Sequence, residues 1–294
     1  MSAHPLRLAT PNAETTDHFR PGCSPLPTPG IRLLWPRGMT ATEILSLLGA
    51  AMAAGAINAV AGGGTILTFP TLLAIGTPPV IANATSTVAL VIGTGGSMYG
   101  FRKHFAGIRV WLWRFVPVSL LGGLIGSWLL TRTSNSVFAH LVPFLILFAT
   151  LLFMVQGAIA GLVKRSAAEP ARTPLIWPAV LFQFVISIYG GFFGAGIGIL
   201  MLATLGFIGL TDIHQMNAVK NILGSLINVV AAVMFIAGGL VDWPKAGVMT
   251  IGAVAGYFLG SHYSQKIPQL WVRRMVLAIG FTISAITFYR QFRS

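Results

Sequence analysis

The sequence has little charge and very few acidic residues. Only 9% of its 294 residues are charged, whereas a soluble domain carries about 25%. Asp and Glu together number 6, against 19 Lys and Arg. This shortage of charge argues against a water-soluble globule, which needs a polar outer surface. The hydrophobic content of 55% and the mean hydropathy of +0.80 instead predict an all-helical, polytopic membrane protein.

Cysteine is almost absent, and the histidines are scattered. The single cysteine, Cys23, allows no intrachain disulfide and no cysteine metal cluster. The histidines lack zinc-site spacing, so we expect no metal site. We also find no nucleophile–base motif, paired intramembrane carboxylates or phosphate loop, and so expect neither an enzyme nor a cofactor. The formal net charge is +13. The basic residues lie between apolar segments, where such residues orient a membrane protein, so we expect no nucleic-acid partner.

The chain divides into a tail and two similar halves. Residues 1–38 contain seven prolines and no long apolar run, which predicts a flexible, Pro-rich N-terminal tail. Eight apolar segments of membrane length follow, four on each side of a charged, proline-marked linker at 164–175. We therefore predict one transmembrane repeat over 39–163 and a second over 176–294.

The first segment of each half is too long for a simple span. Segments 41–76 and 176–209 each contain a glycine cluster, and a shift of 134 residues aligns Gly64 with Gly198 and Asn83 with Asn217. The matches predict two tandem repeats of about four segments, each with a glycine-broken first helix. The basic loops of the two halves are reversed, as in an inverted repeat, if each broken helix re-enters rather than crosses.

A broken helix in hydrocarbon exposes backbone groups that need partners. Half-helices that begin near Thr65 and Ile199 would point their positive N-termini toward a ligand, an arrangement that suits an anion. The alternative is that the glycines only permit close packing or a kink. Glycines at helical spacing elsewhere, such as Gly122 and Gly126 or Gly256 and its neighbours, are assigned to helix packing.

Each break is followed by a helix with a polar stripe, and the second stripe contains Lys220. A lysine inside an apolar helix is a functional candidate, although snorkelling to a nearby interface is the alternative. Nearby Asp212 and His214 suit either a helix cap or a pH-sensitive gate. The predicted substrate-binding residues are Gly62, Gly63, Gly64, Thr65, Asn83, Ser86, Thr87, Gly196, Gly198, Asn217, Lys220 and Asn221.

Several motifs resemble those of one transporter family. Residues 58–65, 69–73 and 82–86 in the first half, and 190–196 and 217–221 in the second, resemble the TauE/SafE family of sulfite exporters and related anion permeases. The resemblance implies a multi-pass permease of the cytoplasmic (inner) membrane. Its substrate would be sulfite, a sulfonate or a carboxylate, and its coupling ion a proton or sodium.

We predict a secondary transporter with alternating access around a site between the two repeats. The alternative is a channel-like facilitator of a small solute, which would need no lysine in the site. The partners expected are the small anion, the coupling ion and the lipid bilayer. The oligomeric state stays open, with a homodimer as one alternative.

Overall fold

The computed structural model describes residues 38–60, 63–100, 105–168, 176–208, 210, 212–263 and 269–293. The chain divides into two units, 1–35 and 36–294. The predicted N-terminal tail lies outside the described residues up to position 37, and the second unit contains every described residue. Within these ranges the fold is all-helical and contains no strand, as predicted.

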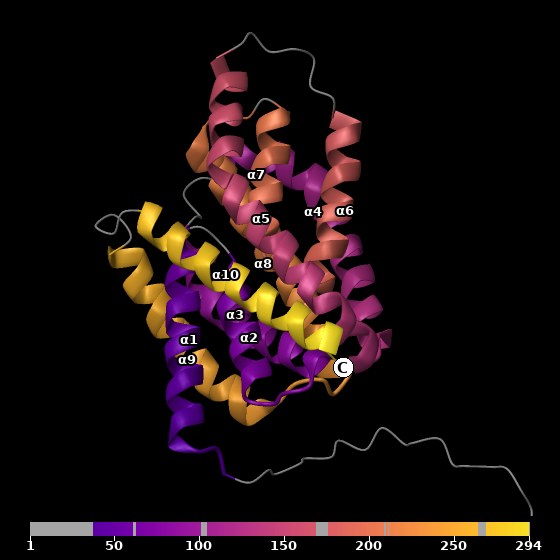
Figure 1. Ribbon diagram of the computed structural model, residues 1–294. Helices are drawn as coiled ribbons and strands as arrows, with labels where there is room; N and C mark the ends of the chain where they lie inside the picture. Colours follow the sequence, from indigo (N-terminus) through magenta and orange to yellow (C-terminus); the bar gives the residue numbers. More distant parts are fainter. Residues whose placement is uncertain are drawn as a thin grey trace, which may run out of the picture. The chain divides into compact units, whose positions relative to one another are not determined.

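The described residues form the following helices, labelled in Figure 1: α1 (Ala41–Val60), α2 (Thr65–Ala74), α3 (Pro79–Gly100), α4 (Phe105–Arg132), α5 (Asn135–Ala168), α6 (Ile176–Phe192), α7 (Ile197–Phe207), α8 (Ile213–Ala237), α9 (Trp243–Tyr263) and α10 (Gln269–Arg293). The first and fifth apolar segments are each split into two helices, as the glycine clusters predict. Helix α5 continues through the first residues of the predicted linker, and 169–175 lie outside the described residues.

Each broken segment folds back as a helical hairpin. A Cβ on Gly64 would meet the backbone of Ala54, so the start of α2 lies beside the last third of α1. In the second half, a Cβ on Gly190 would lie 3.4 Å from side-chain atoms of Ile197, so α7 similarly returns along α6. The two short helices therefore reverse the chain direction instead of continuing it.

Close helix pairs connect the two halves. Helix α1 packs along α9, and α4 packs along α6. A Cβ on Gly256 would collide with the carbonyl oxygen of Met52, and one on Gly126 with that of Ile188. The assignment of these glycines to close packing is confirmed, because no larger residue fits at either contact.

Side-chain bonds bring several helix starts to one end of the helix set. Asn135 Oδ1 accepts a hydrogen bond from Val80 N at 3.1 Å, and Lys245 Nζ donates to Thr77 Oγ1 at 3.1 Å. Helices α3, α5 and α9 therefore begin at this end, whereas α4 and α8 terminate there. We refer to it as the Thr77 end.

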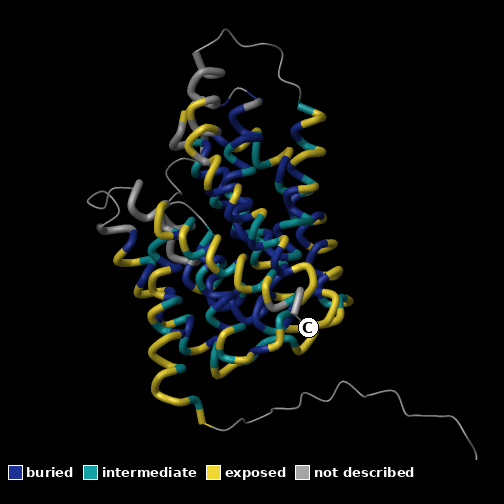
Figure 2. The backbone as a smooth tube through the Cα atoms, viewed as in Figure 1, coloured by how far each residue is buried: buried dark blue, intermediate teal, exposed yellow. Residues whose placement is uncertain are grey.

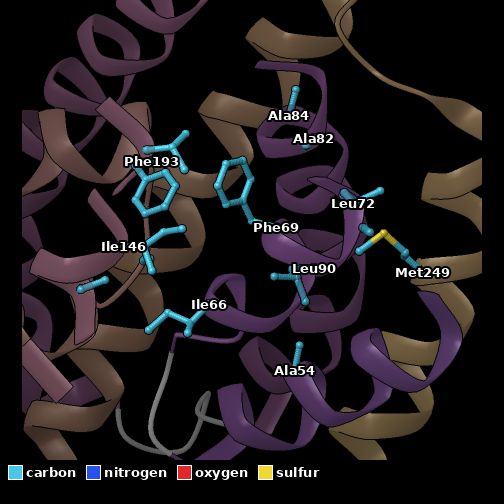
Figure 3. Close-up of a cluster of buried hydrophobic side chains, with 14 of the residues drawn as sticks. Ala54, Ile66, Phe69, Leu72, Ala82, Ala84, Leu90, Ile146, Phe193 and Met249 are labelled. Atoms are coloured by element: carbon cyan, nitrogen blue, oxygen red, sulfur yellow. The ribbon is translucent and has the colours of Figure 1, made fainter. Parts of the chain in front are cut away.

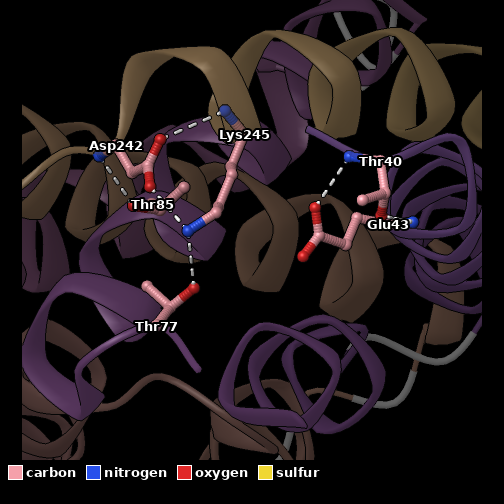
Figure 4. Close-up of polar contacts among 6 residues, drawn as sticks. All are labelled: Thr40, Glu43, Thr77, Thr85, Asp242 and Lys245. Carbon is pink, nitrogen blue, oxygen red and sulfur yellow. Dashed lines mark hydrogen bonds and ion pairs between the residues drawn. The ribbon is translucent and has the colours of Figure 1, made fainter. Parts of the chain in front are cut away.

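Caps define two helix starts. Thr40 N donates to Glu43 Oε2 at 2.9 Å and Glu43 N to Thr40 Oγ1 at 3.3 Å, a capping box at the start of α1. Asp242 caps α9, because its Oδ1 accepts a bond from Lys245 N at 3.3 Å. Figure 4 shows both groups. The caps satisfy N–H groups that have no partner within the helix.

The outer surface suits a lipid environment. Four of the described helices are long and apolar enough to cross a membrane, within Ala41–Asn58, Ile108–Arg132, Asn135–Val155 and Gln215–Ala237. Exposed positions line the outward sides of the helices (Figure 2) and include Trp113, Trp177 and Phe258. Large apolar side chains in such positions are stable against acyl chains and costly in water.

Candidate functional site

The first break lies between α1 and α2. Gly63 has φ of +107°, a conformation that disfavours residues with a Cβ. Gly64 precedes α2, and its N–H donates to Asn58 Oδ1 at 2.6 Å. Thr65 begins α2 and is half-buried, while Gly62 lies outside the described residues. A side chain thus takes one of the backbone donors that this break exposes.

At the second break, between α6 and α7, a side chain donates to a backbone carbonyl, whereas at the first break a side chain accepts from a backbone N–H. Gly194 and Gly196 have φ of +80° and +78°, and Gly196 is the residue before α7. The Tyr189 hydroxyl donates to the carbonyl oxygen of Ala195 at 2.8 Å. The first N–H groups of α7, those of Ile197 and Gly198, have no acceptor among the described residues. The positive end of α7 thus carries two backbone donors without a partner in the described part of the chain.

Lys220 lies beside this open helix end. Its side chain is only 8% exposed. A Cβ on Gly198 would lie 3.3 Å from Lys220 Cδ and 3.9 Å from its Cε, so the lysine stem crosses the first turn of α7. No carboxylate of the described residues forms an ion pair with it. The side chain therefore packs inward, which disfavours snorkelling to a surface.

The equivalent position in the first half carries a hydroxyl. Ser86, which the 134-residue shift matches to Lys220, is fully buried. Its Oγ lies 2.6 Å from Thr68 Oγ1, and Thr68 Oγ1 donates to Gly64 O at 3.3 Å. The Thr87 hydroxyl bonds back to Asn83 O at 2.9 Å. In both halves, the helix after the break thus lies against the start of the short helix.

Asn83 connects the first half to the second break. It is 1% exposed, and its Nδ2 donates to the carbonyl oxygen of Phe192, the last residue of α6, at 3.0 Å. Its Oδ1 is buried without a hydrogen-bond partner in the structure. The predicted Asn217 and Asn221 are half-buried on α8. A buried amide oxygen without a donor is costly unless a ligand or water reaches it.

Aromatic rings also join the two breaks. Phe69 of α2 packs edge-on against Phe193 of the second break, with ring centroids 5.4 Å apart. Figure 3 shows these two rings facing each other. Helix α5 lies against both breaks: a Cβ on Gly63 would collide with the Phe153 ring, and one on Gly196 would lie 3.4 Å from Leu152 Cδ1. The structure therefore places the two breaks around one stretch of α5.

Three residues whose side chains bond to the backbone at the breaks, Asn58, Thr68 and Tyr189, were not among the predicted site residues. Thr68 lies one helical turn after Gly64, so a polar search of α2 would have found it. Asn58 and Tyr189 each precede a break, but nothing in their spacing indicates which backbone group they bond. Their roles depend on how the chain folds back, which only the structure gives.

The remaining polar candidates are Asp212 and His214, near the start of α8. Asp212 immediately precedes α8, and its carbonyl oxygen accepts a bond from Met216 N at 3.0 Å, as expected for a residue at the helix start. The side chain of His214 lies outside the described residues. Within the described part of the chain, no group of three His, Cys, Asp or Glu residues is placed to hold a metal ion.

Replacing Asn83 with Ala tests its link to the second break. We expect the free energy of unfolding to fall by about 1–3 kcal/mol, because Phe192 O would lose its side-chain donor in a buried setting. Thr87→Ala is the matched control one turn later, where the hydroxyl only bonds its own helix. Chemical unfolding in detergent measures both, and equal losses would contradict a linking role for Asn83.

Comparisons with known proteins find similarity to membrane transporters. A family model described as "Sulfite exporter TauE/SafE" matches residues 47–287. A probable membrane transporter protein of Haemophilus influenzae is 28% identical over 237 residues, covering 80% of this chain and 90% of the relative. YfcA, a probable membrane transporter protein of Escherichia coli K12, is 26% identical over 243 residues, covering 81% and 87%. No solved structure matches the chain.

A further relative extends this set. The probable membrane transporter protein ORF9 of a Sinorhizobium species is 29% identical over 240 residues, with coverage of 80% of this chain and 88% of the relative. These relatives are named as transporters, which suggests a non-enzymatic role for similar chains.

Proposed function

Because the chain belongs to the sulfite exporter TauE/SafE family, we propose that it is a secondary transporter of a small oxyanion. Sulfite or an organosulfonate is the preferred substrate class, and a small carboxylate is the alternative. The family and the apolar helices make it a multi-pass membrane protein. We assign it to the cytoplasmic (inner) membrane.

The buried Lys220 beside the start of α7 carries this proposal. An ammonium group in an apolar helix costs about 2.5–3.5 kcal/mol, so a lysine at this position points to a negatively charged partner. The open N–H groups of Ile197 and Gly198 offer further donors on the same side. Charge-assisted hydrogen bonds from an ammonium and from helix N-terminal amides suit a sulfite, sulfonate or carboxylate group.

We further propose alternating access by two inverted repeats. Under the 134-residue shift, α3, α4 and α5 correspond to α8, α9 and α10. At the Thr77 end, α3 and α5 begin and α4 terminates, whereas α8 terminates and α9 begins. Opposite directions of matched helices support an inverted relation, which allows the two halves to exchange conformations around a central site. A proton or sodium gradient would drive the cycle.

A thermal-shift series on the purified protein tests the substrate class. Sulfite, an organosulfonate and a carboxylate are compared with chloride and with a neutral polyol at equal ionic strength. A ligand at 100 times its Kd stabilises the native state by about 2.7 kcal/mol. We expect a selective rise in the unfolding temperature with one oxyanion class, and a flat response to all of them would contradict the proposal.

Uptake into proteoliposomes then separates a transporter from a channel-like facilitator. A transporter site saturates with substrate, and uptake follows an imposed proton or sodium gradient. Non-saturating flux of a neutral solute, without dependence on either gradient, would favour the facilitator.

A further inference from the structure

A large cavity lies behind α2, on the side away from Ser86. Its volume is about 1250 Å³, and α2 contributes Leu67, Pro70 and Thr71 to its wall. The other walls come from α1, α5 and α10, and include Ala53 and Ile279. Helix α10 passes α2 (Figure 1). The short helix therefore has free space on one side.

The opposite side of α2 closes the candidate site. Thr68 lies 2.6 Å from Ser86, oxygen to oxygen, and the Phe69 ring contacts Phe193. Both side chains are fully buried. Successive residues of α2 thus divide between the cavity and the site, so a movement of α2 into the cavity would separate these contacts together.

A glycine with positive φ flanks α2 at each end. Gly63 and Gly76 flank the helix with φ of +107° and +80°, and a Cβ on Gly76 would meet nothing within 4 Å. Just beyond it, Thr77 Oγ1 accepts a bond from Lys245 Nζ at 3.1 Å, and Lys245 pairs with Asp242 at 2.8 Å (Figure 4). The Lys245 and Asp242 side chains are 19% and 18% exposed, so the bond to Thr77 comes from an ion pair that is partly in contact with solvent.

The corresponding helix of the second half, α7, contributes no residue to the lining of this cavity. Ile199, Met201 and Leu205 of α7 are at most 2% exposed. Gly196, at the start of α7, lies against Leu152 of α5. Moving α7 would open packed apolar contacts. Ile66 and Leu72 of α2 are equally buried, so the two short helices differ in the cavity that borders α2 and not in their packing.

We propose that α2 is the moving gate of the transporter: it swings about Gly63 and Gly76 into the cavity and opens the site toward the Thr77 end. This inference rests on the proposed transport function. The Thr68–Ser86 and Phe69–Phe193 contacts are its closed state, and α7 with Lys220 forms the fixed side that holds the anion.

Thiol labelling of position 86 tests the gate without knowledge of the substrate. The parent variant carries Ser86→Cys with Cys23→Ser, which removes the natural cysteine. Adding Ala53→Trp and Ile279→Trp fills the cavity from two walls. Met52→Trp and Phe281→Trp are the matched controls, because these residues lie on the same two helices but do not line the cavity. A small methanethiosulfonate reagent is applied to proteoliposomes.

We expect the parent to be labelled and the cavity-filled variant to react at least tenfold more slowly, while the matched control stays within twofold of the parent. Size-exclusion elution checks that each variant is folded. Equal labelling of the filled variant and the parent, or no labelling of the parent, overturns the gate. Slowed labelling in a protein that transports no oxyanion supports the gate and removes the substrate assignment instead.

Discussion

Replacing Lys220 with Gln is expected to lower saturable oxyanion uptake at least about 100-fold. A 100-fold loss corresponds to about 2.7 kcal/mol, which is within the range of a charge-assisted hydrogen bond lost from a buried site. Lys220 is buried, has no carboxylate partner among the described residues and crosses the first turn of α7. Uptake into proteoliposomes over a range of substrate concentrations measures the loss.

Stability separates this role from a structural one. A cation that serves only the substrate destabilises the empty protein, so Lys220→Gln is expected to leave the unfolding temperature equal or higher. Lys220→Arg, which keeps the charge, is expected to retain part of the uptake. A variant that loses uptake and unfolds at a clearly lower temperature would indicate that Lys220 mainly supports packing.

Adding one methyl group at Gly256 is expected to cost about 3 kcal/mol or more of unfolding free energy. The new Cβ would collide with the carbonyl oxygen of Met52, so α1 and α9 would have to separate. Overpacking against a side chain typically costs about 1–3 kcal/mol, and a backbone contact relaxes less. Chemical unfolding in detergent of the Gly256→Ala variant measures the cost.

Gly247→Ala is the control within the same helix. Gly247 is exposed, and a Cβ there would meet nothing within 4 Å. This change is expected to be neutral or to stabilise by up to about 1 kcal/mol, because Ala favours a helix over Gly. Similar losses in both variants would contradict the close approach of α1 and α9.

The sequence predicted the features that depend on local chemistry. The glycine clusters break two helices, the family resemblance is confirmed, and the glycine ridges are confirmed as packing surfaces. Each of these depends on composition over a few residues: glycine permits a positive φ or a close approach, and apolar length gives the helices. Lys220 lies beside the second break. The sequence indicated this position because Lys220 belongs to the helix that follows the break.

The features that were missed depend on how distant segments meet. The sequence left open whether each broken helix crosses or turns back, because the same glycine run permits both. The bonds of Asn58 and Tyr189 depend on that reversal. Asn83 stays a predicted ligand through its Oδ1, but the bond from its Nδ2 to Phe192 O, 109 positions away in the sequence, was not predicted. No local pattern encodes a contact of that separation.

The most direct test of the central claim is to locate the anion. Selenite replaces sulfite in shape and charge, and its selenium gives an anomalous diffraction signal. We predict one peak beside the start of α7, with oxygens at about 3 Å from Lys220 Nζ and from the N–H of Gly198. A peak at another place in the helix set, or no peak from crystals of protein that transports selenite, would contradict the claim that α7 and Lys220 bind the substrate.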